Sequence, residues 1–332
     1  MSRVVYVGHF AEGKNINDGQ TVKTRTVYRT LTELGIEVKK IDTNNRKTII
    51  PNIIKTCRKG DTVIYSLSRR GYRIVTPILA FYKKLLGIKI INIVIGGSFS
   101  NFLVENRFYR NLSKKHDKIL VETEGMKAQL KNVGLQNVEV LPNYKYLEKE
   151  KRQTKKDGKI RLFTFSRVIK EKGIIDAIDA VKIANEKGTK ATLDIYGKIS
   201  QDFEAEFKEK IAQNSEFVKY KGEERPENGA KIAAKYDGML FLSYWPGEGM
   251  PGTLIDAMFG GCPVIATKWG RNEEIIFDGV NGYTVPTNSP EEAAKKIITI
   301  KNKKLSENCY AHRQRYSSEN AKSKLINILG EV

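Results

Sequence analysis

The chain has 332 residues, of which 40% are hydrophobic, and its formal net charge is +20. This length and apolar content suit two ordinary domains with substantial cores, and no apolar run approaches the roughly 20 residues that span a bilayer. Three scattered cysteines predict neither a disulfide framework nor a metal site and favour a reducing compartment. The N-terminal MSRVVYVGHF turns polar too early for a secretory signal, so we expect a cytoplasmic protein.

The positive charge is concentrated in the first half of the chain. Residues 1–150 carry 27 Lys and Arg against 13 Asp and Glu, and residues 51–100 alone carry 9 against 1. Residues 201–300, in contrast, carry 11 against 16. A one-sided basic domain indicates a phosphate-rich partner, which is either nucleic acid or an anionic membrane surface.

Strand and helix patterns alternate through this first half, which predicts a parallel, doubly wound sheet. In such a sheet, ligands bind at the carboxyl ends of the strands. The expected strands are Val4–Gly8, Ile36–Ile41, Asp61–Ser66, Lys89–Ile95, Lys118–Glu122 and Val138–Leu141. The expected helices are Gln20–Leu34, Lys47–Arg58, Ile74–Leu86, Asn101–Ser113 and Glu124–Asn132.

Two glycine-bearing loops follow predicted strands of this half. The loop after the first strand, HFAEGKNINDGQTVKT, contains Gly13 and Gly19. It is either an ordinary flexible connection or a ligand-contacting loop, and its length and position favour ligand contact. The segment after the fourth strand reads IVIGGSFSN and contains Gly96 and Gly97.

Residues Glu148–Lys159 are densely charged and nearly without apolar side chains, which predicts a linker between domains 1–150 and 151–310. The second domain restarts the alternation, and the tail Leu305–Leu329 reads as a further long helix. The expected strands are Ile160–Ser166, Ala191–Tyr196, Phe217–Tyr220, Gly238–Leu242 and Pro263–Ala266. The expected helices are Lys172–Glu186, Gln201–Ala212, Asn228–Tyr236, Thr253–Phe259 and Pro290–Lys301.

The most informative stretch is Ser243–Ile265, which reads as a Gly/Pro-rich loop, a helix, a turn and a strand. The loop delivers backbone N–H groups to a helix N-terminus, an arrangement that suits a phosphate. Glu248 lies in this loop, and Asp256 lies about two turns into the helix. A carboxylate beside an anion site needs another role, and binding of sugar or ribose hydroxyls is the one we expect.

Three other segments end predicted strands of the second half. SRVIKEKG brings Arg167 and Lys172 to one helix N-terminus, a geometry that holds a diphosphate. The alternative is a solvated cluster in which Arg167 pairs with Glu171. Gly197 follows the second strand, where backbone can approach a ligand closely, and Tyr220 ends the third strand. Tyr220 either flanks a flat base or simply lies on an edge strand.

These motifs resemble those of the family 4 glycosyltransferases. The resemblance lies in SRVIKEKG, LDIYGK, EGMPGTLIDAM, GGCPVIAT and DGVNGYTV, in that order, and covers most of residues 160–285. VLPN before the linker and YSSENAKSKLINIL near the end also fit. The resemblance implies the GT-B fold, with two Rossmann-like α/β domains, a cleft between them, and a C-terminal helix, residues 311–332, that returns to the first domain. It also implies retaining transfer of a sugar from a nucleotide-sugar, with UDP expected from family frequency, without a cofactor or metal.

The resemblance also implies roles for individual residues. Arg167 and Lys172 would bind the diphosphate and Glu248 the donor sugar, so we expect these three to be the catalytic residues. Asp256, where the family usually has Glu, would bind the ribose. Backbone contacts to phosphate or sugar would come from the loop and the helix start, at Gly249, Met250, Gly252, Thr253 and Leu254.

A second departure from the family concerns a His that many relatives carry after the fourth strand to contact the donor sugar. Here Gly96, Gly97 and Ser98 stand in its place. Backbone or serine contacts would replace the imidazole, or His9 or His116 would serve. His9 follows the first strand, whereas we expect His116 to be a surface residue.

The first domain of such enzymes usually holds the acceptor. Residues 69–89 place apolar side chains at helical spacing between clusters of Arg and Lys. This pattern is either a core-packed helix with charged ends or a helix that lies on an anionic membrane. On the membrane hypothesis, the acceptor is a lipid-linked saccharide at the inner face of the cell membrane, as in surface-polysaccharide assembly.

Two other classes of function remain open at this point. One is a nucleotide-sugar epimerase on the same fold, although the chain has only three His in all. The other is a basic nucleic-acid-binding protein, which would explain the charge but not the acids and glycines at strand ends. We therefore expect a nucleotide-sugar and a saccharide as partners, and no nucleic acid.

Overall fold

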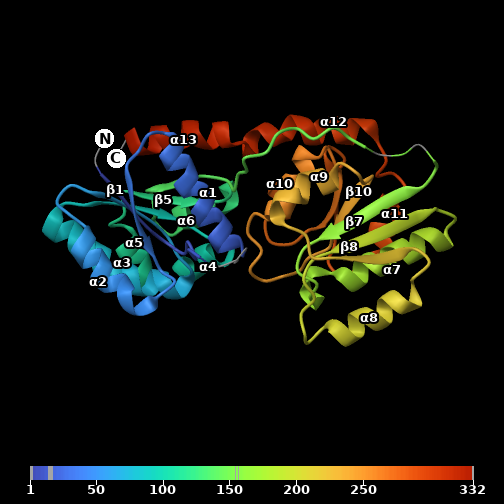
Figure 1. Cartoon of the computed structure of the whole chain (residues 1–332), viewed down its shortest axis with the longest axis horizontal. Coiled ribbons are helices and arrows are strands. Elements are labelled where there is room, and N and C mark those ends of the chain that lie inside the picture. Colours follow the sequence, from blue (N-terminus) through green and yellow to red (C-terminus); the bar gives the residue numbers. More distant parts are fainter. Residues whose placement is uncertain (1–2, 14–17, 154, 156, 331–332) are drawn as a thin grey trace. The chain divides into compact units, whose positions relative to one another are not determined.

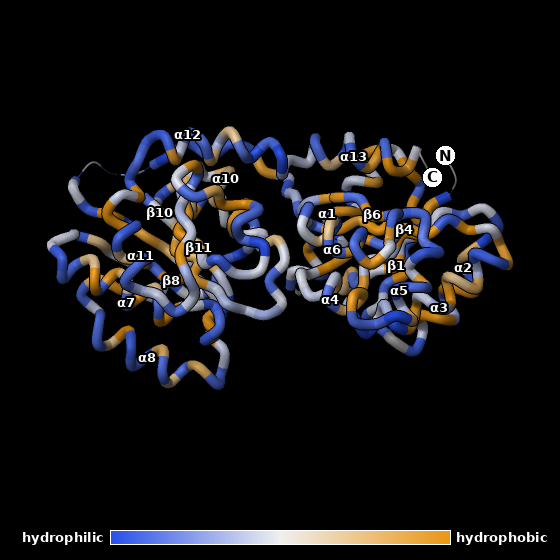
Figure 2. Tube along the Cα trace, turned by 180° about the vertical axis from the view of Figure 1, so that it is seen from behind, coloured by the Kyte–Doolittle hydropathy of each residue, from blue (hydrophilic) through white to orange (hydrophobic). Residues whose placement is uncertain are grey.

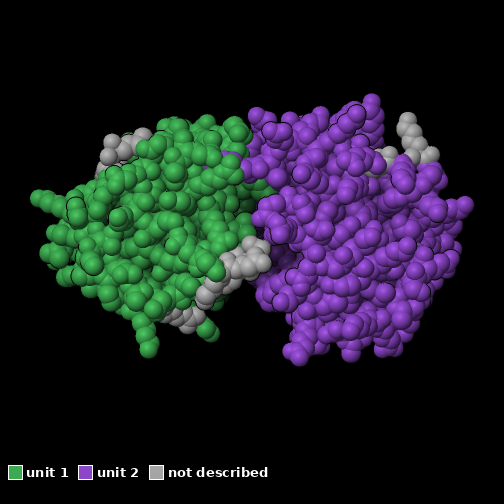
Figure 3. Space-filling model, in the orientation of Figure 1, with its two compact units in different colours: residues 1–145, 318–332 green, residues 146–317 purple. Residues whose placement is uncertain are grey.

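The computed structural model of the chain (Figure 1) describes residues 3–13, 18–153, 155 and 157–330. Residues 14–17 of the first predicted loop, and 154 and 156 of the predicted linker, lie outside the described residues. The chain divides into two compact units, shown in Figure 3. Unit 1 is Met1–Lys145 with Ser318–Val332, and unit 2 is Tyr146–Ser317.

Unit 1 is built around a six-stranded parallel sheet with the order β2-β1-β3-β4-β5-β6. Its strands are β1 (Val4–Gly8), β2 (Val38–Asp42), β3 (Thr62–Ser66), β4 (Lys89–Ile93), β5 (Lys118–Val121) and β6 (Val138–Val140). Its helices are α1 (Gly19–Glu33), η1 (Arg46–Thr48), α2 (Ile49–Thr56), α3 (Arg69–Leu86), α4 (Ser98–Glu105), α5 (Arg107–Ser113), α6 (Glu124–Asn132) and the C-terminal α13 (Ser318–Gly330).

Helices cover both faces of this sheet, which explains why the inner strands β1 and β3 are buried along their whole length. Val5, Val63 and Tyr65 belong to a core shared with α2, α3, α4 and α6. Helix α1 contacts both β1 and α13. In Figure 2 the hydrophobic residues are concentrated along the strands and on the helix faces that meet them. The C-terminal helix is therefore part of unit 1, although 172 residues of unit 2 precede it.

Unit 2 contains a second parallel sheet, with the order β12-β11-β10-β7-β8-β9. Its strands are β7 (Ile160–Phe165), β8 (Ala191–Tyr196), β9 (Val218–Gly222), β10 (Gly238–Phe241), β11 (Val264–Thr267) and β12 (Gly282–Val285). Its helices are η2 (Lys170–Lys172), α7 (Ile174–Glu186), α8 (Glu204–Gln213), η3 (Pro226–Asn228), α9 (Gly229–Ala233), α10 (Gly252–Phe259), η4 (Asn272–Glu274), α11 (Pro290–Ile297), α12 (Lys303–His312) and η5 (Arg313–Tyr316).

The strand order of unit 2 contains a topological switch point. From β7 the chain proceeds through β8 to β9, and it then returns to place β10 on the other side of β7. The connections that leave β7 and β10 therefore diverge, and ligands of doubly wound folds bind in the crevice that this divergence opens. The two doubly wound sheets confirm the α/β fold predicted from the sequence.

Some predicted elements differ from the observed ones. Strand β12 was not predicted, and α3 begins at Arg69 rather than Ile74. The single helix predicted at Asn101–Ser113 is two helices, because Asn106 leaves helical geometry and caps α5 through its side chain. The predicted tail helix is also interrupted, because Ser317 is extended, with ψ 155°, between η5 and α13.

The prediction that His116 lies at the surface is wrong. Its side chain is buried in unit 1, where Nε2 lies 2.5 Å from the Tyr65 hydroxyl and Nδ1 lies 3.1 Å from the Ser113 carbonyl oxygen. Burial lowers the pKa of His116 to about 4, because the imidazolium would lose its hydration. A neutral ring that accepts from Tyr65 and donates to Ser113 satisfies both contacts.

A buried ion pair lies at the carboxyl edge of the unit 1 sheet. Lys23 Nζ donates to Glu122 Oε1 at 2.6 Å and to the Val94 carbonyl at 2.8 Å. The exposed fractions of the two charged side chains are 8% and 2%. Because Val94 and Glu122 follow β4 and β5, Lys23 ties helix α1 to two strand ends.

Candidate functional site

The centre of the candidate site is an ion pair between Lys172 and Glu248. Lys172 Nζ lies 2.5 Å from Glu248 Oε2, and each side chain is 10% exposed. Ser243 donates its hydroxyl to the same oxygen at 2.6 Å. Among the described residues, Glu248 Oε1 has no hydrogen-bond partner. The two residues that the sequence assigned to phosphate and to sugar therefore meet directly.

The backbone around this pair is held by contacts between the segments that follow β7 and β10. Gly173 has φ +64°, and a Cβ atom at this position would lie 2.1 Å from the Leu242 carbonyl oxygen. The Tyr244 N–H donates to the Glu171 carbonyl at 2.8 Å. Only glycine allows so close an approach, and this approach brings Lys172 beside the loop that carries Glu248.

Arg167 lies at the same edge, just beyond β7. Its guanidinium carbon lies 5.0 Å from the ring centre of Trp245, which follows β10. The indole N–H of Trp269 donates to the Trp245 carbonyl at 2.8 Å. The structure therefore places Arg167 over an aromatic ring, rather than in the Glu171 pair considered as the alternative.

The glycine-rich loop leads to the N-terminus of α10, as predicted. Pro251 precedes the helix and gives no side-chain cap to the first N–H groups of α10. Gly252 and Thr253 are partly exposed at this end, whereas Gly249, Met250 and Leu254 are buried. The helix dipole and these N–H groups favour an anion.

Asp256 lies deeper than the proposed ribose contact suggests. It is 3% exposed, and a Cβ atom on Gly229, at the start of α9, would lie 2.4 Å from its Oδ2. The carboxylate thus packs against the first residue of a neighbouring helix, where a negative charge is favourable. Its predicted ribose role stays a prediction.

Gly197 and Tyr220 are brought together at the ends of β8 and β9. The Tyr220 hydroxyl donates to the Gly197 carbonyl at 2.8 Å, and its ring meets Phe207 edge-on. Loss of hydration raises the pKa of the Tyr220 hydroxyl. Gly197 has φ +137°, and a Cβ there would lie 1.7 Å from the Ser166 carbonyl oxygen. Here glycine is required for packing between strand ends.

The other predicted loop residues belong to unit 1. Gly13 and Gly19 lie on either side of residues 14–17 and are exposed, and Gly19 begins α1. Gly96, with φ +82°, and Gly97 lie between β4 and α4. His9, after β1, is partly exposed. Their predicted roles in ligand contact stay predictions.

Sequence reasoning assigned no role to two residues that shape the site. Ser243 holds Glu248, and its own carbonyl accepts a hydrogen bond from the Thr267 hydroxyl. Trp245 supports Arg167. The sequence does indicate Ser243, because it directly follows an apolar strand, where ligand-binding residues of a parallel sheet lie. No local pattern around Trp245 predicts its contact with Arg167, 78 positions earlier.

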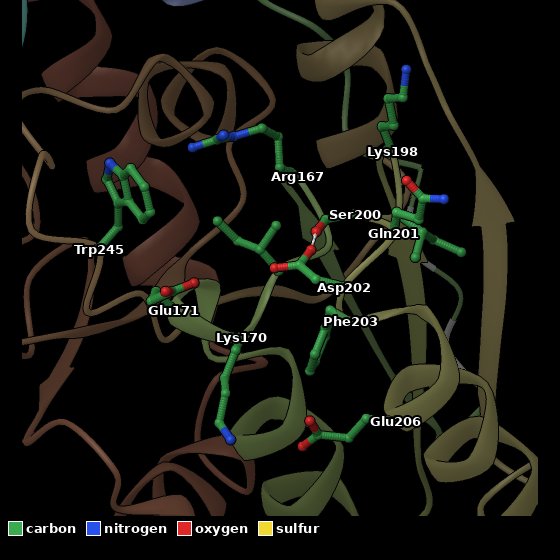
Figure 4. A pocket seen from close by; sticks show the side chains of 12 residues that line it. Arg167, Lys170, Glu171, Lys198, Ser200, Gln201, Asp202, Phe203, Glu206 and Trp245 are labelled. Atoms are coloured by element: carbon green, nitrogen blue, oxygen red, sulfur yellow. Dashed lines mark hydrogen bonds between the residues drawn. The ribbon is translucent and has the colours of Figure 1, made fainter.

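A cavity of about 780 Å³ adjoins this centre (Figure 4). Arg167 and Trp245 lie at one end of it, and the segments after β7 and β8 form its walls. Of the residues that the sequence assigned to the donor, Arg167 lines this cavity. In the described ranges, no group of three or more His, Cys, Asp or Glu side chains is placed to hold a metal ion.

Comparison with known proteins identifies the family. The model described as glycosyl transferases group 1 matches residues 146–323, over half of the chain. The chain belongs to this family of transferases. The match includes every residue of the candidate donor site in unit 2, and it does not favour the epimerase alternative.

Individual relatives are more distant. An uncharacterised glycosyltransferase of Methanocaldococcus jannaschii is 29% identical over 246 residues, 67% of this chain and 60% of that protein. The GtfA subunit of the UDP-N-acetylglucosamine–peptide N-acetylglucosaminyltransferase of Streptococcus gordonii is 28% identical over 184 residues, 52% of this chain and 35% of that protein. The chain thus spans between about one third and three fifths of these relatives.

A solved structure matches nearly the whole chain. The HepE protein of Anabaena, in complex with UDP, superposes with a TM-score of 0.77 at 16% identity, covering 99% of this chain and 100% of that chain. At this identity the likeness shows the GT-B fold alone.

Proposed function

We propose that this protein is a glycosyltransferase that takes its sugar from a UDP-sugar and passes it to a saccharide acceptor. The observation that carries the proposal is the Lys172–Glu248 ion pair at the switch point between β7 and β10, with Arg167 packed on Trp245 at the same edge. Family membership supports it, as do the UDP in the HepE complex and the UDP-sugar in the name of the streptococcal relative.

Each residue contributes a distinct interaction to this reaction. The cations of Arg167 and Lys172, with the N–H groups that begin α10, offset the charge of the departing diphosphate. Glu248 Oε1 accepts hydrogen bonds from donor-sugar hydroxyls while Oε2 stays held by Ser243 and Lys172. Ser243 is thus a positioning residue. Protein cations take the role that a metal has elsewhere, so we propose that transfer needs no added metal.

A donor screen that detects released nucleoside diphosphate tests this function. We expect turnover with a UDP-sugar, in the presence of a chelator, and weak UDP binding in Arg167→Ala. Absence of UDP binding by the wild-type protein, measured by calorimetry, would contradict the proposal. The anomeric configuration of the product, determined by NMR, tests the further proposal that transfer is retaining.

We further propose that the acceptor is lipid-linked and that unit 1 docks on an anionic membrane. Exposed apolar side chains gather on α2 and α3, which lie side by side (Figures 1 and 2). On α3 they recur at helical spacing on a second apolar face, opposite the one in the core. We call this surface the α2–α3 face, and it consists of Ile50, Ile54, Ile74, Phe81 and Leu85.

The charge around the α2–α3 face supports the same partner. Residues 51–100 contain a single acid, Asp61, which is buried and paired with Arg3 at 2.7 Å. The exposed charges of this region are therefore basic, among them Arg70, Arg73 and Lys84. Apolar side chains flanked by cations favour the boundary of an anionic bilayer. In the described ranges, no helix has the length and apolarity needed to cross a bilayer.

Vesicle flotation tests the docking proposal. We expect binding to vesicles that contain anionic lipid, reduced binding to neutral vesicles, and loss of binding in Phe81→Asp/Leu85→Asp. Ile298→Asp is the matched control, because Ile298 is exposed in unit 2 rather than on this face. Equal binding of the double variant and the control would contradict the proposal.

A further inference from the structure

The cavity beside Arg167 is preformed. The segments that leave β7 and β8 continue their pairing beyond the strands, through a parallel bridge between Val168 and Ile199. Val168 N–H donates to the Lys198 carbonyl at 2.8 Å, and Ser200 N–H donates to the Val168 carbonyl at 3.1 Å. Phe203, buried in the core, anchors the end of the second segment. Backbone hydrogen bonds therefore fix both walls, and a ligand would not have to order them.

The lining combines opposite charges with apolar surface. Three cations and three carboxylates face the cavity, so their formal charges balance, and Ile169, Ile199 and Phe203 add apolar surface. In Figure 4, Lys170 and Glu206 lie at the end opposite Arg167. Asp202 lies between Arg167 and these two residues and is hydrogen-bonded to Ser200. The charged residues are Arg167, Lys170, Lys198, Glu171, Asp202 and Glu206.

The charged and apolar lining of the cavity favours one class of ligand over others. The carboxylates disfavour a polyanion such as a diphosphate or a nucleic acid, and the charged walls disfavour a lipid chain. A sugar chain offers hydroxyls that both donate and accept, together with C–H faces that pack on the Trp245 ring. The volume of about 780 Å³ lies within the roughly 300–1,000 Å³ of small-molecule sites.

The cavity adjoins the Lys172–Glu248 centre, because Glu171, next to Lys172 in the chain, lines it. Trp245 lies three residues before Glu248, and its N–H donates to Ser243 Oγ at 3.3 Å. Arg167 belongs to both sites. We propose that this cavity is a saccharide subsite of unit 2, which holds sugar units of the acceptor whose end reaches Arg167. The acceptor role rests on the proposed transferase function, whereas saccharide binding itself can be tested separately.

Fluorescence of Trp245 provides the test, because the chain contains two Trp residues. Trp269→Phe leaves Trp245 as the sole Trp residue, whose indole emission can be followed apart from that of the Tyr residues. The probes are tetrasaccharides of glucose, mannose, galactose and N-acetylglucosamine. We expect at least one to change the emission saturably, and Asp202→Asn/Glu206→Gln on this background to raise the half-saturating concentration about tenfold or more. Glu209→Gln, an exposed position on the same helix α8 that does not line the cavity, is the control.

Each result decides the question. No emission change with any tetrasaccharide, or an equal change in the double variant and the control, overturns the subsite. Lys198→Met replaces the double variant if that variant lacks the wild-type melting transition. If a tetrasaccharide binds but no UDP-sugar is turned over and UDP does not bind, the transferase proposal fails while the saccharide site stands.

Discussion

Each unit has a Lys–Glu pair at the carboxyl edge of its sheet, and the two pairs differ in what surrounds them. In unit 1, Lys23 also binds the Val94 carbonyl, and Glu122 is almost fully buried. In unit 2, Lys172 and Ser243 converge on one oxygen of Glu248, while the other oxygen has no partner among the described residues. The first pair is enclosed by protein, whereas the second retains capacity for a ligand.

The strand order of unit 1 also has a switch point, between β1 and β3, and the surroundings of the two switch points show the same difference. In unit 1, the Tyr6, Thr24 and Ser66 hydroxyls bond one another, and a Cβ on Gly8 would lie 2.5 Å from Thr24 Cγ2. In unit 2, Arg167 packs on the Trp245 ring at the equivalent edge, and both residues line a cavity. The same topology therefore supports a buried hydroxyl cluster at the edge of one unit and a cavity at the edge of the other, and the side chains decide which.

Removal of Lys23 should have the largest effect on the free energy of unfolding. Lys23→Ala leaves Glu122 buried without its ammonium partner, at a cost of about 3–5 kcal/mol in the free energy of unfolding. Urea denaturation measures this loss. Lys23→Met/Glu122→Leu should recover most of the stability, because it removes both buried charges. A cost below about 1 kcal/mol for Lys23→Ala would show that the Lys23–Glu122 pair does not stabilise the packing of α1 on the strand ends.

Removal of Lys172 should affect catalysis more than folding. Lys172→Ala removes a cation that stabilises the leaving diphosphate, so we expect kcat to fall about 100- to 1,000-fold. Glu248→Gln should also reduce kcat. Steady-state assays with a UDP-sugar provide the measurement, and Lys182→Ala, an exposed position on α7, serves as the control. If Lys172→Ala instead lowers stability as much as Lys23→Ala does, the contrast between the pairs is wrong.

His116 should make the stability of unit 1 depend on pH. Its folded-state pKa of about 4 lies below the ordinary value of 6.5. The unfolded chain therefore binds the proton first, and stability is lost as pH falls from about 6.5 towards 4, by up to the order of 3 kcal/mol. Unfolding titrations at several pH values test this, with His116→Gln as the comparison. A variant with an undiminished pH dependence would assign the effect to other groups.

Two glycines with positive φ should respond differently to alanine. Gly188 has φ +88°, and among the described residues no atom beyond its chain neighbours lies within 4 Å of the position that a Cβ would take, so Gly188→Ala should cost about 1–2 kcal/mol from backbone strain. Gly197→Ala adds a clash with the Ser166 carbonyl oxygen and should cost roughly 1–3 kcal/mol more. Thermal unfolding gives the difference. Equal costs would show that the backbone after β7 and β8 moves readily to accommodate the added methyl group.

Local sequence patterns determined much of this protein. Strand and helix periodicity predicted two doubly wound sheets, because burial on both faces leaves a local apolar signature. The pattern also brought Lys172 and Glu248 to one edge, because their segments follow parallel strands that end together. Their proposed roles are independent of that placement and stay predictions.

Tertiary packing decided the rest. His116 lies in the polar sequence KKHDK, but its side chain is buried and hydrogen-bonded to Tyr65, 51 residues earlier. Asp256 turns towards Gly229, and Trp245 towards Arg167. Whether an edge is closed or open to a ligand depends on such contacts between distant side chains. Periodicity reports which face of an element is buried, but not which residue from another segment it meets.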